Sequence, residues 1–393
     1  MTVIKDIHSL TKLTPAQLWA LAEDKKFPMA AWNPPGSTKN YLLIGLSDLT
    51  QVSTQQIEEL GEGFVVNAFD HSHPPQPLFM KADLLMTWGD APAHLSVAPS
   101  LSSSEIDEFI AHINSKETVP MPPMTNVEAY RFQETVKRCL PQIDGHDLLK
   151  VVLSRCDDHS LPEGFDAFGK FQQLVARYPE AMNYLLYLPG RSKWLGATPE
   201  QLLKTTEGRH FQTASLAGTQ LLKGNERLKD VAWTQKEIEE QAIVSRYIID
   251  CFKKIRLREF EEHGPRTVRA GKLAHLKTQF VVDMDSAQMP KLGSIMLDLL
   301  HPTSAVCGTP MDVALDFIRT HEHYDRELYS GFLGPIHIDQ EVNLFVNLRC
   351  MQIRGNKGRF YAGAGITEDS DPQKEEIETE LKLQTMKSVV FDT

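Results

Sequence analysis

The sequence of 393 residues has few cysteines and no apolar run long enough to cross a bilayer. Its five cysteines are scattered and include no C-x-x-C pair, which argues against a disulfide framework or a zinc site. The first residues also lack the apolar centre of a signal peptide. We therefore expect reduced, mostly buried thiols, a cytoplasmic protein and no membrane partner.

Basic residues do not outnumber acidic ones, and the net charge is −11. This balance argues against a nucleic acid or an anionic membrane as partner, because both bind basic surfaces. A small anionic substrate remains compatible with it, provided that local cations or a metal ion receive the charge. The glycine-rich phosphate loops G-x-G-x-x-G and G-x-x-x-x-G-K-[ST] are also missing, so the usual nucleotide-binding sites have no support.

The composition that remains is that of an ordinary globular protein, with 41% hydrophobic and 24% charged residues. Proline-containing stretches at 71–77, 99–104 and 119–124 predict loops. We expect the last of them to separate an N-terminal part of the fold, residues 1–123, from a region that carries the chemistry, residues 124–393. Both parts are expected to belong to essentially one compact domain.

Hairpins interspersed with helices predict an α+β fold with large, mainly antiparallel sheets. Thr125 and Glu128 have the spacing of a capping box and predict that a helix begins there. Another helix is predicted at 235–252, and two more begin at 309–310 and 371–372, where a proline follows a capping residue. The predicted strands span 148–154, 183–188, 194–197, 343–353 and 359–362.

Two E-x-x-E units lie on separate predicted helices. Glu237 and Glu240 form the first, and Glu375 and Glu378 form the second, with Lys382 one turn beyond. Residues three or four apart share a helix face, so each unit points two carboxylates the same way. Four carboxylates brought together need a cation, and oxygen ligands without histidine or cysteine suit Mg²⁺. The alternative is two solvated helix faces.

Two polar residues stand at positions where burial would change their chemistry. Lys150 lies in an apolar predicted strand, either as a buried lysine whose low pKa makes it a base or as a surface lysine. Arg155 in the same strand has the same ambiguity. Glu200 follows Pro199 at a predicted strand end, either as a proton donor held over a cavity or as the first turn of a helix.

Small-residue motifs and single cations offer further candidates. LAGT (216–219) and AGAG (362–365) predict either close approach of a ligand to the backbone or simple tight turns. Arg349, on a predicted strand, favours bidentate carboxylate binding or a cross-strand salt bridge. His275 in LAHLKTQF is more typical of a satisfied core histidine than of a ligand.

Ten motifs in order along the chain resemble the chorismate-utilising enzymes, which include isochorismate, anthranilate, aminodeoxychorismate and salicylate synthases. The resemblance covers about residues 124–386. The motifs are KVVLSR (150–155), LGATPEQLL (195–203), SLAGT (215–219), K-x-x-x-E (236–240), HL (275–276), LHPTSAVCGTP (300–310), DRELYSGFLG (325–334), NLRC (347–350), AGAGI (362–366) and E-x-x-E-T-x-x-K-L (375–383).

Within this family the chain is most similar to the isochorismate synthases. Ala305 stands where anthranilate synthases carry Thr, and Ala217 stands where many aminodeoxychorismate synthases carry a nucleophilic Lys. A salicylate synthase is the first alternative, because Tyr329 fits both patterns. A non-catalytic chorismate-binding paralogue is an alternative of a different class, although Lys150 and Glu200 are both present. An acidic scaffold protein would not explain the ordered motifs.

The resemblance implies a Mg²⁺ ion held by Glu240 and Glu378, with Glu237 and Glu375 acting through metal-bound water. It also implies that Lys150 deprotonates the water that attacks C2 of chorismate and that Glu200 protonates the leaving C4 hydroxyl. The remaining residues implied to contact the substrate are Gly218, Thr219, His275, Ala305, Arg349, Gly363 and Lys382.

The same resemblance sets expectations for partners. The expected substrate is chorismate, and the product would serve menaquinone or siderophore biosynthesis. No glutaminase subunit is expected, because the reaction needs no ammonia, and a monomer is expected. The sequence departs from the family at Gln241-Ala242, where many members carry His and a polar residue, so the surroundings of Glu240 differ while Glu240 itself is kept.

Overall fold

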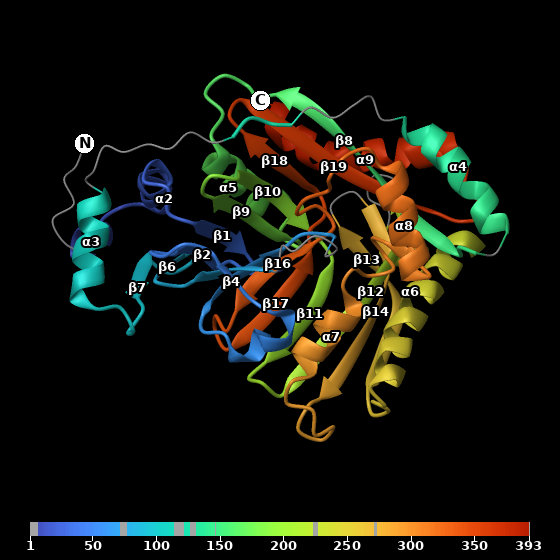
Figure 1. Ribbon diagram of the computed structural model, residues 1–393, viewed down its shortest axis with the longest axis horizontal. Helices are drawn as coiled ribbons and strands as arrows, with labels where there is room; N and C mark the ends of the chain where they lie inside the picture. Colours follow the sequence, from blue (N-terminus) through green and yellow to red (C-terminus); the bar gives the residue numbers. More distant parts are fainter. Residues whose placement is uncertain are drawn as a thin grey trace.

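Two antiparallel sheets form the centre of the molecule, and helices cover their outer faces (Figure 1). The structure is a computed structural model that describes residues 7–70, 77–113, 122–125, 131–145, 147–222, 227–270 and 273–392. Every strand pair within these ranges is antiparallel, from β1 with β2 (Met29–Asn33 and Asn40–Ile44) to β6 with β7 (Leu84–Trp88 and His94–Val97). The predicted α+β class with large, mainly antiparallel sheets is therefore confirmed.

The described strands divide into a ten-stranded and a nine-stranded sheet. The ten-stranded sheet has the order β15 (Gly308–Thr309), β8 (Lys150–Ser160), β19 (Lys357–Ile366), β18 (Cys350–Arg354), β10 (Ser192–Thr198), β9 (Met182–Leu188), β1, β2, β6, β7. The nine-stranded sheet has the order β13 (Glu261–Ala270), β14 (Leu273–Asp283), β12 (His210–Leu221), β11 (Gln201–Thr206), β17 (Glu341–Val346), β16 (Phe332–Ile336), β4 (Gly63–Asn67), β5 (Leu78–Lys81), β3 (Thr50–Gln51).

The helices pack in two groups on the outer faces of these sheets (Figure 1). One group covers the ten-stranded sheet and consists of α2 (Pro15–Asp24), α3 (Ser103–Ile113), α5 (Ala167–Arg177) and α9 (Pro372–Phe391), with the short α1 (Ile7–Leu10) beside them. The other group consists of α4 (Phe132–Asp144), α6 (Gln235–Lys254), α7 (Leu292–Leu300) and α8 (Met311–His321). Two 3-10 helices span Thr54–Glu59 and Leu228–Asp230.

Aromatic side chains fill the space between the two sheets. Trp32, Phe64 and Phe345 belong to this inter-sheet core. Tyr361 stacks between Trp194, at 5.4 Å, and Tyr329, at 5.2 Å between ring centroids. A strand that lies between this core and the outer helices is buried on both faces. Its sequence is therefore apolar without alternation, as in MNYLLYL of β9. The stack ends at Tyr329, beside the strands that carry the polar residues described below.

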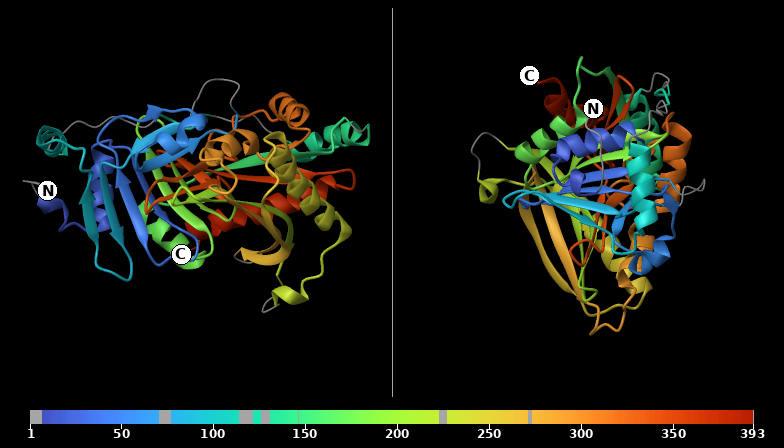
Figure 2. Two further views of the ribbon diagram at one scale, coloured as in Figure 1. Left: turned by 90° about the horizontal axis from the view of Figure 1, so that it is seen from below. Right: turned by 90° about the vertical axis from the view of Figure 1, so that its left-hand side faces the viewer.

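Strands from before and after residue 124 share both sheets. β1, β2, β6 and β7 extend the ten-stranded sheet, and β3, β4 and β5 extend the nine-stranded one. Figure 2 shows these blue strands at one end of the molecule and the helices α4, α6 and α8 towards the other. The N-terminal segment is thus part of the same sheets as the C-terminal region. None of the helices in the described ranges is long and apolar enough to cross a membrane.

Two of the places where the chain crosses from one sheet to the other are neighbours. Pro199 and Glu200 connect β10 with β11, and 347–349 connects β17 with β18. The crossings are hydrogen-bonded to each other, from Val346 N to the Glu200 carbonyl at 2.9 Å and from Ala197 N to the Arg349 carbonyl at 3.1 Å. The prediction of one strand at 343–353 is therefore wrong, because the chain changes sheets at 347–349. The reading of Glu200 as a helix start is also wrong.

The other predicted elements fare differently. α6, the β9–β10 hairpin and the start of α9 at Pro372 are confirmed. The prediction of a loop at 99–104 is wrong at its end, because α3 begins at Ser103. Most of the predicted loops at 71–77 and 119–124 lies outside the described residues, as does Glu128 of the predicted capping box. The described helix after that point begins at Phe132.

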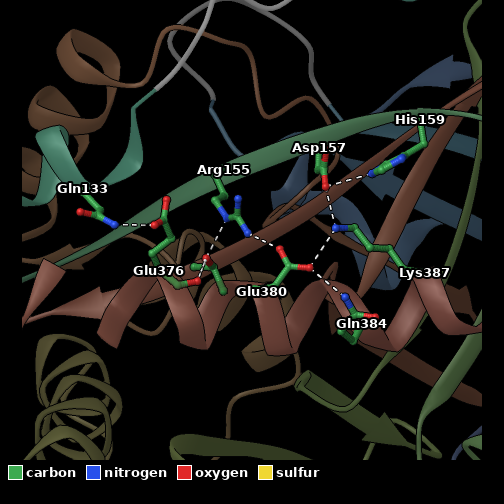
Figure 3. A network of polar contacts seen from close by, with 9 residues as sticks. Gln133, Arg155, Asp157, His159, Glu376, Glu380, Gln384 and Lys387 are labelled. Carbon is green, nitrogen blue, oxygen red and sulfur yellow. Dashed lines mark hydrogen bonds and ion pairs between the residues drawn. The ribbon is translucent and has the colours of Figure 1, made fainter. Parts of the chain in front are cut away.

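A chain of ion pairs fixes α9 to β8 (Figure 3). Arg155 on β8 donates to Thr379 Oγ1 at 2.8 Å and pairs with Glu380 at 2.5 Å. Lys387 bridges Glu380, at 3.0 Å, and Asp157 on β8, at 2.6 Å. Positions 380 and 387 share a helix face different from that of positions 378 and 382. This network therefore sets the position of the helix that carries the second E-x-x-E unit. It also shows the role of Arg155, which binds α9 to β8.

Candidate active site

Lys150 is buried at the start of β8 and pairs with a carboxylate of α6. Its side chain is 1% exposed, and its Nζ lies 2.9 Å from Glu240 Oε1. The reading of Lys150 as a surface lysine is therefore wrong. A Cβ placed on Gly365 of β19 would lie only 2.9 Å from Lys150 Cε and 3.0 Å from Glu240 Oε1. The absence of a side chain at Gly365 therefore provides the space that this ion pair occupies.

Glu200 lies at the first crossing with its side chain buried. The residue is 7% exposed, and within the described ranges its carboxyl group has no hydrogen-bond partner. Burial raises its pKa to about 7, although the cations of Lys150, Arg349 and Lys382 act in the opposite direction. A carboxyl group in this state can hold a proton near neutral pH and donate it to a bound molecule.

Arg349 lies at the second crossing in a strained backbone conformation. Its φ is +48°, which a residue with a side chain adopts at some cost in energy. The buried side chain of Asn347 holds this turn, accepting a hydrogen bond from Tyr184 Oη and donating one to the carbonyl of Leu328 at 2.8 Å. Arg349 therefore does not lie within a strand, as the sequence predicted, but in the connection between the two sheets.

The guanidinium of Arg349 is available to a ligand. Within the described part of the chain, its side chain makes no ion pair and no hydrogen bond. The alternative prediction, a cross-strand salt bridge, is therefore wrong for the described residues. Burial lowers its pKa, which Tyr329, Glu378 and Glu200 partly offset. With His275 it lines a cavity of about 670 Å³ that extends towards α5 and α9. A half-buried guanidinium that lines a cavity and is not paired with another described residue suits the binding of a carboxylate.

His275 is buried on β14 and faces the bulge of β12. Its Nδ1 lies 2.9 Å from the carbonyl oxygen of Gly218 and 3.3 Å from Thr219 Oγ1. Burial, with Arg349 and Lys382 nearby, lowers its pKa to about 3, so the ring is neutral at neutral pH. Because Nδ1 faces a carbonyl, we assign the proton to Nδ1. Nε2 is then an acceptor, buried and without a partner among the described residues.

The two small-residue motifs lie inside strands and not in loops. Gly218 sits at a bulge of β12 with φ +70°, a conformation that glycine adopts without strain. Gly363 lies within β19, where an added Cβ would be 3.0 Å from the hydroxyl of Tyr329. The tight-turn reading is therefore wrong for both motifs. Close approach to the backbone is what the geometry of Gly363 and Gly365 allows.

Three of the four predicted carboxylates gather between α6 and α9, each with its own lysine. Besides the Lys150–Glu240 pair, Lys236 lies 2.8 Å from Glu375 and Lys382 lies 2.6 Å from Glu378. Burial alone would lower the pKa of Lys236, but Glu375, with Glu378 and Glu240 nearby, raises it. The solvated-face alternative is wrong for Glu375, which is buried. Lys236, part of the K-x-x-x-E motif, received no role from the sequence.

The fourth carboxylate is engaged in capping α6. Glu237 Oε2 accepts hydrogen bonds from Thr234 N at 2.7 Å and from Gln220 Nε2 at 2.7 Å. Thr234 and Glu237 together form a capping box at the start of the helix. The T-x-x-E spacing was present in the sequence and would have identified this role.

The carboxylate oxygens are of the type that binds Mg²⁺, but few of them could contact the ion directly. No group of three or more His, Cys, Asp or Glu in the described ranges is arranged to hold a metal ion. Mg²⁺ commonly keeps several waters and takes only one or two carboxylates from the protein. Burial works against ionisation of Glu240, but Lys150, Lys382 and Lys236 hold its pKa below the usual value, so it is available as an anionic ligand. Two carboxylates with water therefore fit this ion.

The remaining candidates lie around these groups. Lys382 Nζ donates to the carbonyl of Gly363 at 2.8 Å, which joins α9 to β19. Ala305 is half-buried in the segment between α7 and β15, next to Thr303 and Ser304, whose hydroxyl oxygens are buried without a described partner. The cysteines are free, and all but one are fully buried, as predicted.

Comparisons with known proteins identify the family and the fold of this chain. The family described as "Chorismate binding enzyme" matches residues 50–391. The chain is 31% identical over 285 residues to isochorismate synthase EntC of Escherichia coli K12, which is 70% of each protein. The menaquinone-specific isochorismate synthase MenF of Escherichia coli superposes with a TM-score of 0.78 at 23% identity, covering 96% of this chain and 92% of that one.

The fold is shared more widely. Anthranilate synthase component I of Streptococcus pneumoniae superposes with a TM-score of 0.68 at 18% identity, covering 98% of this chain and 100% of that one. The resemblance inferred from the ordered motifs and the predicted fold are thus confirmed. The family match also begins at residue 50, well before the 124–386 range over which the motifs were found.

Proposed function

The chain belongs to the chorismate-binding enzymes, and we propose that it is an isochorismate synthase, an isomerase that converts chorismate into isochorismate. The observation that carries the proposal is Glu200, a buried residue whose carboxyl group has no hydrogen-bond partner among the described residues and whose pKa of about 7 lets it hold a proton. A proton donor of this kind is what the departure of a ring hydroxyl requires.

The reaction moves a hydroxyl group from C4 to C2 of the ring, and the double bonds shift. We assign Lys150 as the base that takes a proton from the water attacking C2. Glu200 gives its proton to the C4 hydroxyl, which leaves as water. General acid–base catalysis of this kind typically contributes about 10²–10⁴-fold in rate. Because Lys150 Nζ is engaged by Glu240 Oε1 at 2.9 Å, the base role requires this contact to open when the substrate binds.

The substrate carboxylates and hydroxyl would be held by the cations and backbone around the cavity. Arg349 would bind the carboxylate of the enolpyruvyl group, since none of the residues that the structure describes pairs with its guanidinium. His275 Nε2 would accept a hydrogen bond from a ring hydroxyl. Lys382 and the backbone at Gly218, Thr219 and Gly363 would complete the pocket. Ala305, smaller than Thr, would leave space for water.

Mg²⁺ would be held by Glu240 and Glu378, and when bound it would neutralise the ring carboxylate of the substrate. Glu375, which pairs with Lys236, and Glu237, which caps α6, would act through metal-bound water. We propose that the chain acts as a monomer without a glutaminase subunit. Its product would enter menaquinone or siderophore biosynthesis in the cytoplasm.

Purified protein incubated with chorismate, with and without Mg²⁺, tests the proposal. We expect a Mg²⁺-dependent product that has the mass of chorismate but separates from it by chromatography. Lys150→Ala and Glu200→Ala should abolish turnover while chorismate binding is retained. Lys193→Ala is the matched control, because Lys193 is a strand lysine paired with Glu23 on the outer face of the same sheet.

Other products would assign a different activity. Salicylate together with pyruvate would identify a salicylate synthase. Binding of chorismate without conversion would identify a non-catalytic paralogue. Normal turnover by Lys150→Ala or Glu200→Ala would contradict the assignment of the base or the acid.

A further inference from the structure

A small cavity adjoins Glu200 between the nine-stranded sheet and α6. Its volume is about 10 Å³, and Glu200, Thr303, Thr213 and Val244 are among the residues that line it. Val244 is one helical turn beyond Glu240, so the cavity lies next to the carboxylate cluster along α6. A buried water needs roughly 10–15 Å³ and two to four polar partners. The cavity therefore has the size of one water molecule.

The polar groups around this cavity are the partners that such a water needs. Thr303 is nine-tenths buried, and its Oγ1 has no hydrogen-bond partner in the described part of the chain. The carboxyl group of Glu200 is likewise without one. The hydroxyl of Thr213 donates to the Leu202 carbonyl at 2.6 Å and keeps its lone pairs. Leaving the buried Thr303 hydroxyl unsatisfied would cost about 1–3 kcal/mol.

We propose that one buried water occupies this cavity and joins Thr303 to Glu200, which makes Thr303 a positioning residue for the catalytic acid. This inference rests on the proposed function, in which Glu200 is that acid. The Thr303 hydroxyl donates to the water oxygen, and the water donates to one oxygen of Glu200. The other carboxyl oxygen, which carries the proton, is then directed to the substrate.

The water has a second effect once the proton has moved. Glu200 becomes a carboxylate when it protonates the C4 hydroxyl, and a hydrogen bond from the water stabilises that charge. The water keeps both of its own protons throughout. The charged groups that face Glu200 are Lys150 from β8, Arg349 from the crossing and Lys382 from α9. Tyr247 of α6 also lines the cavity, but its hydroxyl donates to the Leu299 carbonyl at 2.7 Å.

Three variants separate this role from general support of the fold. Thr303→Val keeps the shape and removes the hydroxyl, whereas Thr303→Ser keeps the hydroxyl. Thr309→Val is the matched control, because its Oγ1 is also buried without a described partner but does not line the cavity. We expect Thr303→Val to lower kcat about tenfold, the effect of losing one hydrogen bond to a developing charge, with KM changed by less than about twofold.

The pH profile gives a readout that a structural defect would not move. Without the water, the charged form of Glu200 is less stable, so its pKa rises. The pH above which kcat declines should therefore be higher in Thr303→Val than in the wild type. Thr303→Ser and Thr309→Val should keep the wild-type kcat and profile. A wild-type kcat and profile in Thr303→Val, or an equal loss in Thr303→Ser, would overturn the inference.

A crystal structure tests the water whatever the activity assay shows. We expect electron density for one water within hydrogen-bonding distance of Thr303 Oγ1 and Glu200 in the wild type, and none in Thr303→Val. A dry cavity in the wild type would overturn this inference and leave the proposed function standing. A wild-type enzyme that holds the water but does not convert chorismate would refute the proposed function, and with it the role of Thr303.

Discussion

Replacing Arg326 with methionine is expected to lower the free energy of unfolding by about 3–5 kcal/mol, the usual cost of breaking a buried ion pair from one side. The guanidinium donates two hydrogen bonds to Glu322, at 2.7 and 2.6 Å, and one each to the carbonyls of Val306, at 3.0 Å, and Val152, at 2.8 Å. It thereby joins the strand of Lys150 to the segment of Ala305. Methionine is of similar length but has no donor.

The structure places this cost towards the lower end of that range. Glu322 also accepts hydrogen bonds from Ser154 N at 2.6 Å and from Ser154 Oγ at 2.9 Å, so its charge would keep two donors. The two carbonyls would lose theirs, at about 1–3 kcal/mol each if water does not reach them. These contributions share one side chain and do not simply add. We therefore expect a value near 3 kcal/mol.

Arg319→Met is the matched control. Arg319 makes the same two-pronged contact with Asp70, at 2.8 and 2.6 Å, but its side chain is 36% exposed and that of Asp70 is 31% exposed. Water and salt screen such a pair, and its contribution is about 0–1 kcal/mol. The two substitutions remove the same chemical group, so the difference between them reports the burial of the ion pair together with the two carbonyl hydrogen bonds of Arg326.

Urea unfolding followed by circular dichroism and tryptophan fluorescence measures both effects. The double variant Arg326→Met/Glu322→Met should recover at least part of the loss, because no buried charge is then left without a partner. The reasoning is refuted if Arg326→Met destabilises no more than Arg319→Met. It is also refuted if the free energy of unfolding of the double variant is lower than that of Arg326→Met by a further loss of about 3–5 kcal/mol, the cost of breaking a buried ion pair.

Four further outcomes are expected. Turnover should fall as pH rises through about 7, because Glu200 must be protonated, and the pH–rate profile measures this. Because of the same raised pKa, the folded state keeps a proton on Glu200 that the unfolded state releases above about pH 4.5. The free energy of unfolding should therefore fall by roughly 3 kcal/mol between about pH 4.5 and 7. Urea titrations at each pH measure this fall, which Glu200→Gln should remove. Arg349→Lys should raise KM for chorismate about tenfold or more with a smaller change in kcat, measured by steady-state kinetics, because an ammonium cannot make the two-pronged carboxylate contact. Lys387→Met should lower stability by about 1 kcal/mol in urea unfolding, since it separates Asp157 from Glu380 (Figure 3), and an unchanged midpoint would contradict a role for this network.

Periodicity and local turn chemistry predicted the elements that need no tertiary information. α6 has apolar residues at helical spacing, and β9–β10 is a hairpin around Pro189-Gly190, so both are readable from neighbouring residues. The burial of Lys150 could not be read in this way, because a lysine in an apolar strand faces either solvent or the interior. The answer depends on Glu240, ninety residues away in sequence.

The crossings between the sheets were beyond the reach of the sequence. An apolar run such as NLFVNLRCMQI reads as one strand, and nothing in its spacing marks the change of sheet at Asn347–Arg349. The residue pattern also could not show that Glu200 occupies the neighbouring crossing. Glu237 is the opposite case: its capping spacing from Thr234 was visible, but the E-x-x-E pattern drew the interpretation to a metal site.

The most direct test of the central claim is to run the reaction with chorismate in oxygen-18 water and to weigh the product. Attack of water on C2 with loss of the C4 hydroxyl predicts isochorismate that carries one oxygen-18 atom, formed by the wild type and not by Lys150→Ala or Glu200→Ala. Isochorismate without the label would contradict water attack. Salicylate and pyruvate as the products, or no conversion of chorismate, would contradict the assignment as an isochorismate synthase.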